Sequence, residues 1–414
     1  MPIYQSPGTY VEEIPGGARP LAMVGTSTAA FLGVAPAAGK HLNEPVAVNN
    51  WGQFVREFTD ENSSATDLAR AVYGFFLNGG SRCYILNVGQ GNSIAGDARK
   101  RTGIIALETV DEAKIIAAPG CTDVLSYEAL ISHCEKMGDR FAILDAPARA
   151  DNLDALKKVA TAGAGAGAGE GEDKKKKAAS TDALRPRQTN CAAFYFPWIR
   201  AADPMVAGEI VDTAPSGHLA GVYARTDATR GVHKAPANEP IRGALDLCFK
   251  VTHAEQGELN SAGVNIIRFF PDAGIRVWGA RTLAEEASEW RYISVRRLFN
   301  MIEQSIQDGT RWIVFESNDS RTWKAIERDI RAFLTLVWRD GALKGDTPEQ
   351  AFFVKCDDET NPPEVIDAGR LITEIGIAPV KPAEFIIFRI SQWIGGGPEE
   401  EAGAGEATAE ASEG

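Results

Sequence analysis

The chain has 414 residues, of which 44% are hydrophobic and 24% are charged, and its net charge is −13. This length is enough for two or three domains with sizeable cores. The acidic balance argues against nucleic acid as the main partner, because phosphate binding needs clustered Lys and Arg. Part of the negative charge lies near the end of the chain, at Glu399, Glu400, Glu401, Glu406, Glu410 and Glu413. Without these six residues the net charge is −7.

The first eight residues, Met-Pro-Ile-Tyr-Gln-Ser-Pro-Gly, contain neither a basic stretch nor an apolar run, so we expect no signal peptide. No apolar run approaches the ~18 residues of a membrane span, so we expect no membrane insertion and assembly in the cytoplasm. Six cysteines are scattered without a CxxC pair and are predicted to be reduced core residues: Cys83, Cys121, Cys134, Cys191, Cys248 and Cys356.

The first 24 residues contain four prolines around a short β-prone run and are predicted to form an extended arm. Helices and strands then alternate. We predict strands at 29–34, 83–88, 114–117 and 141–144, and helices at 51–58 (capped by Asn50), 67–79 (capped by Asp67), 125–137 and 153–160. Strands separated by helices of this length indicate βαβ units with a largely parallel sheet, and hence an α/β fold.

Residues 162–182 interrupt this pattern with Ala-Gly repeats and the run Lys174–Lys177. The segment holds four acidic residues and four lysines, so its net charge is zero. Low complexity and balanced charge predict a disordered surface loop rather than a nucleic-acid site. The glycines also fail the GxGxxG spacing of a dinucleotide-binding loop.

Beyond this segment we predict a strand at 192–196, a loop-rich stretch to about Asn260 and a strand at 264–269. Helices are predicted at 295–307, ending at Gly309, and at 321–339, ending at Gly341. Further strands are expected at 312–315, 352–355, 371–377 and 385–390. The final residues, 395–414, are Gly, Ala and Glu in composition and are expected to be disordered.

The helix predicted at 321–339 has two stripes. Apolar residues recur at three- and four-residue steps, which predicts one buried face. A second stripe is basic and consists of Arg321, Lys324, Arg328 and Arg331. It is either a solvated face paired with neighbouring acids or a docking surface for an acidic partner.

We find no catalytic or cofactor motif. The P-loop, HExxH and EF-hand patterns are missing, and the five histidines lie far apart in the sequence. Gly25–Ala29 resembles a nucleophile elbow but ends in Ala, and Ser216-Gly217-His218 after Pro215 is typical of a turn or a helix cap. We therefore predict no catalytic residues, no cofactor and no metal. A hydrolase with a spatial Ser-His-acid cluster remains the alternative.

Several segments in chain order resemble the tail sheath family of contractile phages, R-type pyocins and extracellular contractile injection systems. These segments are Ser6–Ile14, Arg19-Pro20, Val24–Phe31, Pro215–Asp227, Gly231–Asn238, Val277–Leu283, Tyr292–Arg297, Phe315–Asn318, Ile377–Phe385 and Ile387–Ile390. The resemblance covers almost the whole chain except 162–182 and 395–414.

The resemblance implies an outer α/β region with a subtilisin-like centre, an inner α+β C-terminal domain facing a tube, and terminal strands donated to neighbouring subunits. We expect an arm at 1–24, the outer region at 25–260, the inner domain at 261–394 and an acidic tail at 395–414. The implied function is structural and not enzymatic. Copies would polymerise helically, as stacked hexameric rings, around an inner tube in a metastable extended state. Contraction would then drive the tube through a target envelope.

The donated strands are predicted to be Tyr10, Val11, Glu12, Glu13 and Ile14 in the arm, and Phe385, Ile386, Ile387, Phe388, Arg389 and Ile390 near the C-terminus. The alternative is that both pair within their own domain. Joints that absorb contraction are predicted at Pro15, Gly16, Gly17, Pro379 and Pro382. The basic stripe is the predicted tube contact.

The implied partners are copies of the chain, the tube, baseplate and terminator proteins, and paralogous sheath subunits. The assembly would be a phage tail or a released tail-like particle. A cap or adaptor that shares only the C-terminal region is a further alternative, but the N-terminal arm argues against it.

Overall fold

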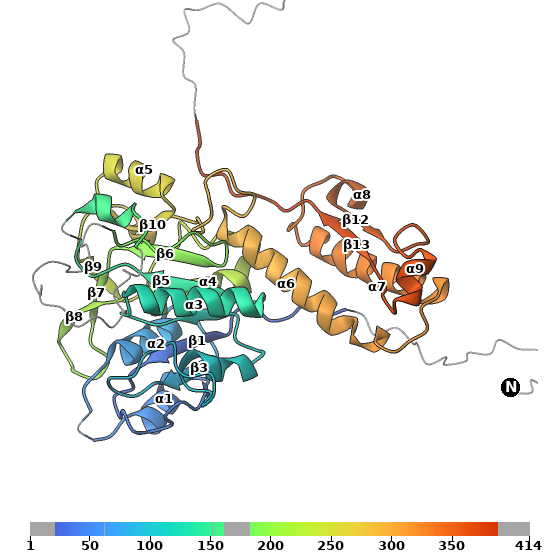
Figure 1. Cartoon of the computed structure of the whole chain (residues 1–414). Helices are drawn as coiled ribbons and strands as arrows, with labels where there is room; N and C mark the ends of the chain where they lie inside the picture. Colours follow the sequence, from blue (N-terminus) through green and yellow to red (C-terminus); the bar gives the residue numbers. More distant parts are fainter. Residues whose placement is uncertain (1–20, 62, 151, 161–182, 388–414) are drawn as a thin grey trace, which may run out of the picture. The chain divides into compact units, whose positions relative to one another are not determined.

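The computed structural model describes residues 21–61, 63–150, 152–160 and 183–387, and Figure 1 shows their mixed α and β architecture. The principal sheet has eight strands in the order β11-β10-β6-β5-β4-β1-β3-β2. Its strands are β1 Ala29–Gly33, β2 Val46–Val48, β3 Cys83–Asn87, β4 Ile115–Ala117, β5 Phe141–Asp145, β6 Ala192–Phe196, β10 Val264–Phe270 and β11 Gly274–Val277. The six inner strands pair in parallel, and β2 and β11 are antiparallel strands at the two edges. The predicted α/β fold with a largely parallel sheet is confirmed.

Helices cover both faces of this sheet. They are α1 Trp51–Phe58, α2 Asp67–Leu77, α3 Val124–Met137, α4 Ser216–Arg230 and α5 His253–Ser261. Strands β1, β5 and β6 are buried along their whole length, as expected for parallel strands covered on both sides. Consecutive residues point to opposite faces, so Phe31 packs in the core with α2 and α4, while Leu32 packs in the core with α3.

A second, smaller region follows the sheet. It contains α6 Ile293–Gly309, α7 Ser320–Arg339, α8 Pro348–Ala351, α9 Pro363–Asp367, and the two antiparallel strands β12 Phe352–Lys355 and β13 Glu374–Ile377. A third hydrophobic core joins α6 and α7 to these strands through residues such as Leu298, Ile330, Phe333 and Val354. The chain divides into two units, residues 1–382 and 383–414, and all of these elements belong to the first.

Most elements predicted in the first 150 residues are confirmed, with Asn50 capping α1 as expected. The cap of α2 is Thr66 rather than Asp67, because the Thr66 hydroxyl accepts the Ala69 N–H. The helix predicted at 153–160 is wrong. Only the 3₁₀ turn Leu153–Leu156 forms there, like the 3₁₀ turn Gly103–Thr109 elsewhere in the chain.

Two predictions in the second half are also wrong. The stretch from 197 to 260 is not loop-rich, since it contains α4, α5 and a three-stranded sheet of β7 Ile199–Ala202, β8 Ile210–Thr213 and β9 Ala244–Leu247. Residues 312–315 are not a strand, because the 3₁₀ turn Arg311–Ile313 and a tight turn occupy them. The strand predicted at 371–377 is confirmed only over β13.

All six cysteines are free thiols, and Cys83, Cys134, Cys191 and Cys356 are buried, as expected of reduced core residues, whereas Cys121 and Cys248 are only partly buried. No helix in the described ranges is long and apolar enough to cross a membrane. The predicted loop at 162–182 and the predicted tail at 395–414 lie outside the described residues.

Helices α2 and α4 pack against each other at very short range, and glycines make this possible. A Cβ atom on Gly217 would lie 2.3 Å from the Ala71 Cα, and one on Gly221 would lie 2.5 Å from the Phe75 carbonyl oxygen. Both distances are to backbone atoms, which cannot move aside without shifting α2. The start of α4 is therefore fixed against α2 by close backbone contact.

We expect Gly217→Ala to lower the free energy of unfolding by about 2–4 kcal/mol, because the added methyl group forces the two helices apart. Denaturant unfolding followed by circular dichroism measures this change. Gly257→Ala on α5 is the matched control, since no atom lies within 4 Å of the position that its added methyl group would take. The control should raise stability by up to about 1 kcal/mol through helix propensity. Equal effects of the two substitutions would contradict the close-packing explanation.

Candidate functional site

The two-stranded ribbon β12–β13 has open edges. Its register pairs Phe352 with Ile377 and Lys355 with Glu374, and the Ala378 N–H donates to the Ala351 carbonyl at 2.8 Å. Because hydrogen-bonded and non-hydrogen-bonded pairs alternate in an antiparallel ladder, the backbone groups of Ile375 and Ile377 face away from β12. Among the described residues, no third strand joins this sheet. Within the described residues, the ribbon therefore offers outward-facing N–H and C=O groups along β13, whereas the Phe352 N–H of β12 already donates to the Pro348 carbonyl.

The ribbon is supported from one side only. Phe352 and Val354 pack into the core shared with α6 and α7, whereas Phe353 on the opposite face is 55% exposed. The Phe353 ring covers Gly376 of the neighbouring strand, where a Cβ atom would lie 2.1 Å from the ring. A two-stranded ribbon is marginal by itself, so this packing is what holds its edges in a defined position.

The residues predicted to be donated lie mostly outside the described residues. This holds for all of 10–14, for the joint at 15–17 and for 388–390. Phe385, Ile386 and Ile387 are described, are not in a strand and are 72–80% exposed. An exposed apolar run of this kind fits a segment that pairs elsewhere, and donation stays a prediction.

The two prolines of the predicted C-terminal joint, Pro379 and Pro382, lie in different surroundings. Pro379 forms an antiparallel bridge with Leu343, and the Val380 N–H donates to the Ala342 carbonyl at 3.1 Å. Pro382 is the last residue of the first unit. The backbone is thus hydrogen-bonded through Val380, so the predicted joint at Pro379 lies in a paired segment, and the joint at Pro382 stays a prediction.

The basic stripe lies on the exposed side of α7, as its spacing predicts. Arg328 pairs with Asp329 at 2.9 Å and Arg331 pairs with Glu327 at 3.1 Å. Within the described part of the chain, neither Arg321 nor Lys324 takes part in an ion pair. The stripe is partly neutralised at its C-terminal half and carries its free positive charge at the N-terminal half.

A buried ion pair joins α6 to the α/β body. The Arg297 guanidinium donates to both carboxylate oxygens of Asp227 on α4, at 2.9 and 2.6 Å, and its second nitrogen also donates to the Thr26 carbonyl. The Thr26 hydroxyl donates to the same carboxylate at 2.6 Å. The two charged side chains are only 4% and 5% exposed. Burial alone would lower the pKa of Arg297, but the Asp227 carboxylate outweighs burial and the pKa is raised.

The ion pair has neighbours on both sides. The Arg297 guanidinium lies 4.9 Å from the ring centre of Tyr223, whose hydroxyl is 2.7 Å from that of Tyr195 on β6. Along α6, the Val24 N–H donates to the Ser305 hydroxyl at 3.0 Å, and Leu21 packs against Gly309. The chain that enters β1 is thus fastened to α6 before it reaches the sheet.

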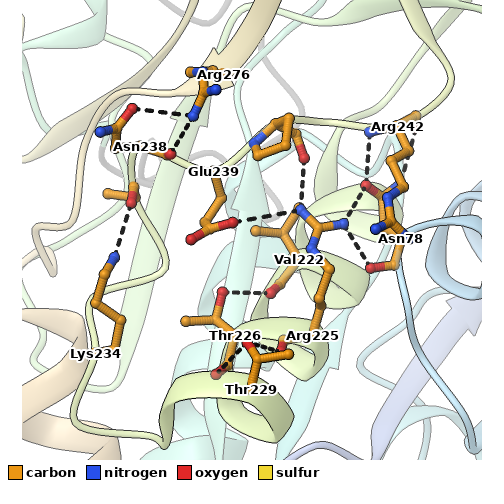
Figure 2. Close-up of polar contacts among 12 residues, drawn as sticks. Asn78, Val222, Arg225, Thr226, Thr229, Lys234, Asn238, Glu239, Arg242 and Arg276 are labelled. Atoms are coloured by element: carbon orange, nitrogen blue, oxygen red, sulfur yellow. Dashed lines mark hydrogen bonds and ion pairs between the residues drawn. The ribbon is translucent and has the colours of Figure 1, made fainter. Parts of the chain in front are cut away.

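The segment after α4 is fixed by a second polar network, shown in Figure 2. Arg225 donates to the carbonyls of Asn78 and Pro240 at 2.8 and 2.7 Å, and Asn78 exchanges two hydrogen bonds with the backbone of Arg242. Further along, the Arg276 guanidinium donates to the Asn238 carbonyl at 2.7 Å.

This segment reaches both parts of the molecule. Its Ile241 packs in the core between the sheet and α2, whereas its Val232 packs in the core of α6 and α7. Residues 231–243 therefore form a second rigid bridge between the α/β body and the C-terminal region.

Sequence reasoning missed the Arg297–Asp227 pair, although both residues lie in segments that carry the family resemblance. The signal available in the sequence was one charged residue on an otherwise apolar helix face, once in α4 and once in α6. A single sequence cannot show that two such residues, 70 positions apart, meet.

The Ser216–His218 pair does not form a catalytic arrangement. Ser216 begins α4, and its hydroxyl and N–H both donate to Asp145, at 2.6 and 2.8 Å. Burial raises the pKa of Asp145 to about 7, and the donors from Ser216 and Gly120 oppose this shift. His218 points the other way, with its Nδ1 atom against Gly74 of α2, and burial lowers its pKa to about 4. The Ser216 hydroxyl thus donates its hydrogen bond directly to the Asp145 carboxylate, and His218 does not lie between them.

Two family models match the chain. The phage tail sheath protein central domain matches residues 101–283, and the phage tail sheath C-terminal domain matches residues 285–392. The tail sheath protein of Vibrio phage KVP40 is 31% identical over 174 residues, which cover 41% of this chain and 25% of that protein. The chain thus spans a quarter of the length of this curated relative.

Solved structures are similar over nearly the whole chain. The PVC sheath complex of an extracellular contractile injection system, in its contracted state, has a TM-score of 0.75 and 30% identity, and covers 95% of this chain and 99% of its own. The helical sheath of the anti-feeding prophage, also contracted, has a TM-score of 0.73 and 28% identity, and covers 94% of this chain and 100% of its own.

Replacing Arg297 by Met should lower the free energy of unfolding by about 3–5 kcal/mol, because Asp227 is left charged, buried and without its partner. Arg331→Met is the matched control, since it removes an exposed pair worth under about 1 kcal/mol. Chemical denaturation of both variants provides the comparison. A loss at Arg297 no greater than that at Arg331 would show that the pair does not hold α6 to the body.

Proposed function

The chain belongs to the phage tail sheath family, and on this basis we propose that it is a structural subunit that polymerises into a contractile sheath, without enzymatic activity. The observation that carries the proposal is the supported ribbon β12–β13 with open edges. An open edge of this kind is completed by a strand from another chain. The direct hydrogen bonds from Ser216 to Asp145 speak against the hydrolase alternative.

Strands from two neighbours would complete the ribbon. The edge of β13 presents Ile375 and Ile377, and that of β12 presents Val354, since the Phe352 N–H already donates to the Pro348 carbonyl. We assign residues 10–14 of one neighbour and 385–390 of another as the incoming strands. Donation from one subunit to the next is heterologous, so it generates rings or open helices rather than closed dimers.

The basic stripe of α7 would contact the inner tube. Arg321 and Lys324 have no ion-pair partner among the described residues, and an acidic tube surface would complement their positive charge. This contact would hold the sheath on its template in the extended state. Baseplate, terminator and paralogous sheath subunits are further proposed partners at the ends and within the lattice.

Contraction would rotate each subunit while strand pairing persists. The two bridges at Arg297 and at residues 231–243 keep the body and the C-terminal region together, so the change would fall on the joints at 15–17 and after Val380. Two packings that differ by about 2 kcal/mol per subunit, a difference of the size seen in switching proteins, would release a large sum over a long lattice. No nucleotide is required for this release.

Reversing charge at Lys324 and Arg328 to Glu should prevent extended sheath from forming on the tube while leaving the fold intact, because the acidic template would repel the stripe. Negative-stain electron microscopy of sheath and tube made together measures this. Arg99→Glu with Lys100→Glu, in an exposed loop of the body, is the control of equal charge change. If the Lys324/Arg328 variant formed normal extended sheath, the assignment of the basic stripe as the tube contact would be wrong.

Ile387→Pro should abolish polymers without changing the thermal stability of the monomer, since proline lacks the N–H that a paired strand needs. Ala404→Pro, in the acidic tail, provides a control outside the assigned strand. Sedimentation velocity distinguishes monomer from polymer. Polymers of normal length from the Ile387 variant would favour pairing of this segment within its own domain or no pairing at all.

A further inference from the structure

The turn between α6 and α7 presents an aromatic side chain in a strained position. The Glu316 N–H donates to the Ile313 carbonyl at 2.9 Å, Val314 has φ −61° and ψ 122°, and Phe315 has φ +71°. These values define a type II turn with Phe315 at its third position. That position favours glycine, because a side chain with positive φ crowds the backbone.

Phe315 also gains nothing from burial. Its side chain is fully exposed (103%), Val314 is 65% exposed and Trp312 is exposed as well. We call these three residues the apolar tip. Neither the backbone strain, on the order of 1–3 kcal/mol, nor the exposed apolar surface is offset by packing in the isolated chain.

The apolar tip is held rigidly. The Asn318 amide donates to the Arg370 carbonyl at 2.7 Å and accepts the Trp323 Nε1–H at 2.8 Å. Asp319 caps α7 by accepting the N–H groups of Arg321 and Thr322. A mobile loop would relax its strain, whereas this one is held after the tip by Asn318 and Asp319 and before it by the Ile313 N–H, which donates to the Thr310 carbonyl at 3.0 Å. Rigid aromatic side chains are the usual anchors of protein interfaces, since they lose little conformational entropy on binding.

We propose that the apolar tip is a contact between copies of this chain, with Phe315 entering an apolar depression on the neighbouring subunit. Asn318 fastens the tip to Arg370, four residues before β13, so the tip is continuous with the strand-accepting ribbon. The charges next to the tip have no positive excess: Arg311 pairs with Asp308 at 2.7 Å, and the acidic residues Glu316 and Asp319 follow the tip in the sequence. Such surroundings favour an apolar contact between like chains over an electrostatic contact with the acidic tube. The proposal rests on the proposed function as a polymerising subunit.

Phe315→Gly tests the proposal, because a structural and an interface residue respond in opposite ways. Glycine relieves the strain, so the melting temperature of the monomer should be unchanged or higher by up to about 3 °C. The critical concentration for polymer formation, measured by pelleting, should nevertheless rise at least tenfold. Phe315→Leu keeps an apolar side chain and should polymerise within about threefold of the parent chain.

Arg101→Gly is the matched control, since Arg101 is an exposed residue with φ +52° in the body. It should leave polymer formation unchanged. Polymer formation by Phe315→Gly at the parent concentration overturns the proposal. So does normal self-assembly with loss of assembly only on the tube, which would place the tip against the tube instead. The Ile387 and Lys324/Arg328 variants test the proposed function separately, because neither touches the tip.

Discussion

Where α6 meets α4, a buried guanidinium and a buried carboxylate hold each other through two short hydrogen bonds. A buried ion pair contributes little net stability compared with apolar packing, but an unmatched geometry is very costly. We infer that Arg297 and Asp227 mainly determine how α6 is oriented against α4, and that they add little to the stability of the contact. Thr26 is hydrogen-bonded to both residues of the pair, so the segment that leads into β1 is held at the same point.

This constraint decides where the molecule changes shape. Residues 231–243 bridge the same two regions, with Val232 in one core and Ile241 in the other. Two independent bridges with interdigitated side chains do not deform gradually, because packed interiors are bistable rather than elastic. We propose that movement between lattices therefore falls on the joints near the two ends of the chain, and that its energy comes from the difference between two packings of whole subunits.

The sequence predicted the parallel sheet and the two stripes of α7 because both follow from local periodicity. Alternation of apolar runs and helices is visible within windows of ten to twenty residues. Periodicity did not predict α4, because the face of this helix against α2 is built from Gly217 and Gly221 and so has little apolar periodicity. It also failed at residues 312–315, where an apolar run of β-prone residues reads as a strand but forms an exposed turn. The Arg297–Asp227 pair was out of reach because it depends on contacts between distant segments.

An open ribbon is a hazard as well as a site, since unpaired edges attract any extended chain. Here the edge of β13 ends at Pro379, whose ring faces the open side by the alternation of the ladder and offers no N–H there. The ribbon is only four residues long, and Lys355 and Glu374 place charges at its end. Each strand that we propose to be donated would thus gain few hydrogen bonds, at about 0.5–1.5 kcal/mol apiece. Stable association then requires several weak contacts at once, and their combined effective concentration is high only where neighbouring subunits are already aligned. Because its pairing is weak, the short ribbon favours growth on an ordered lattice over indiscriminate aggregation.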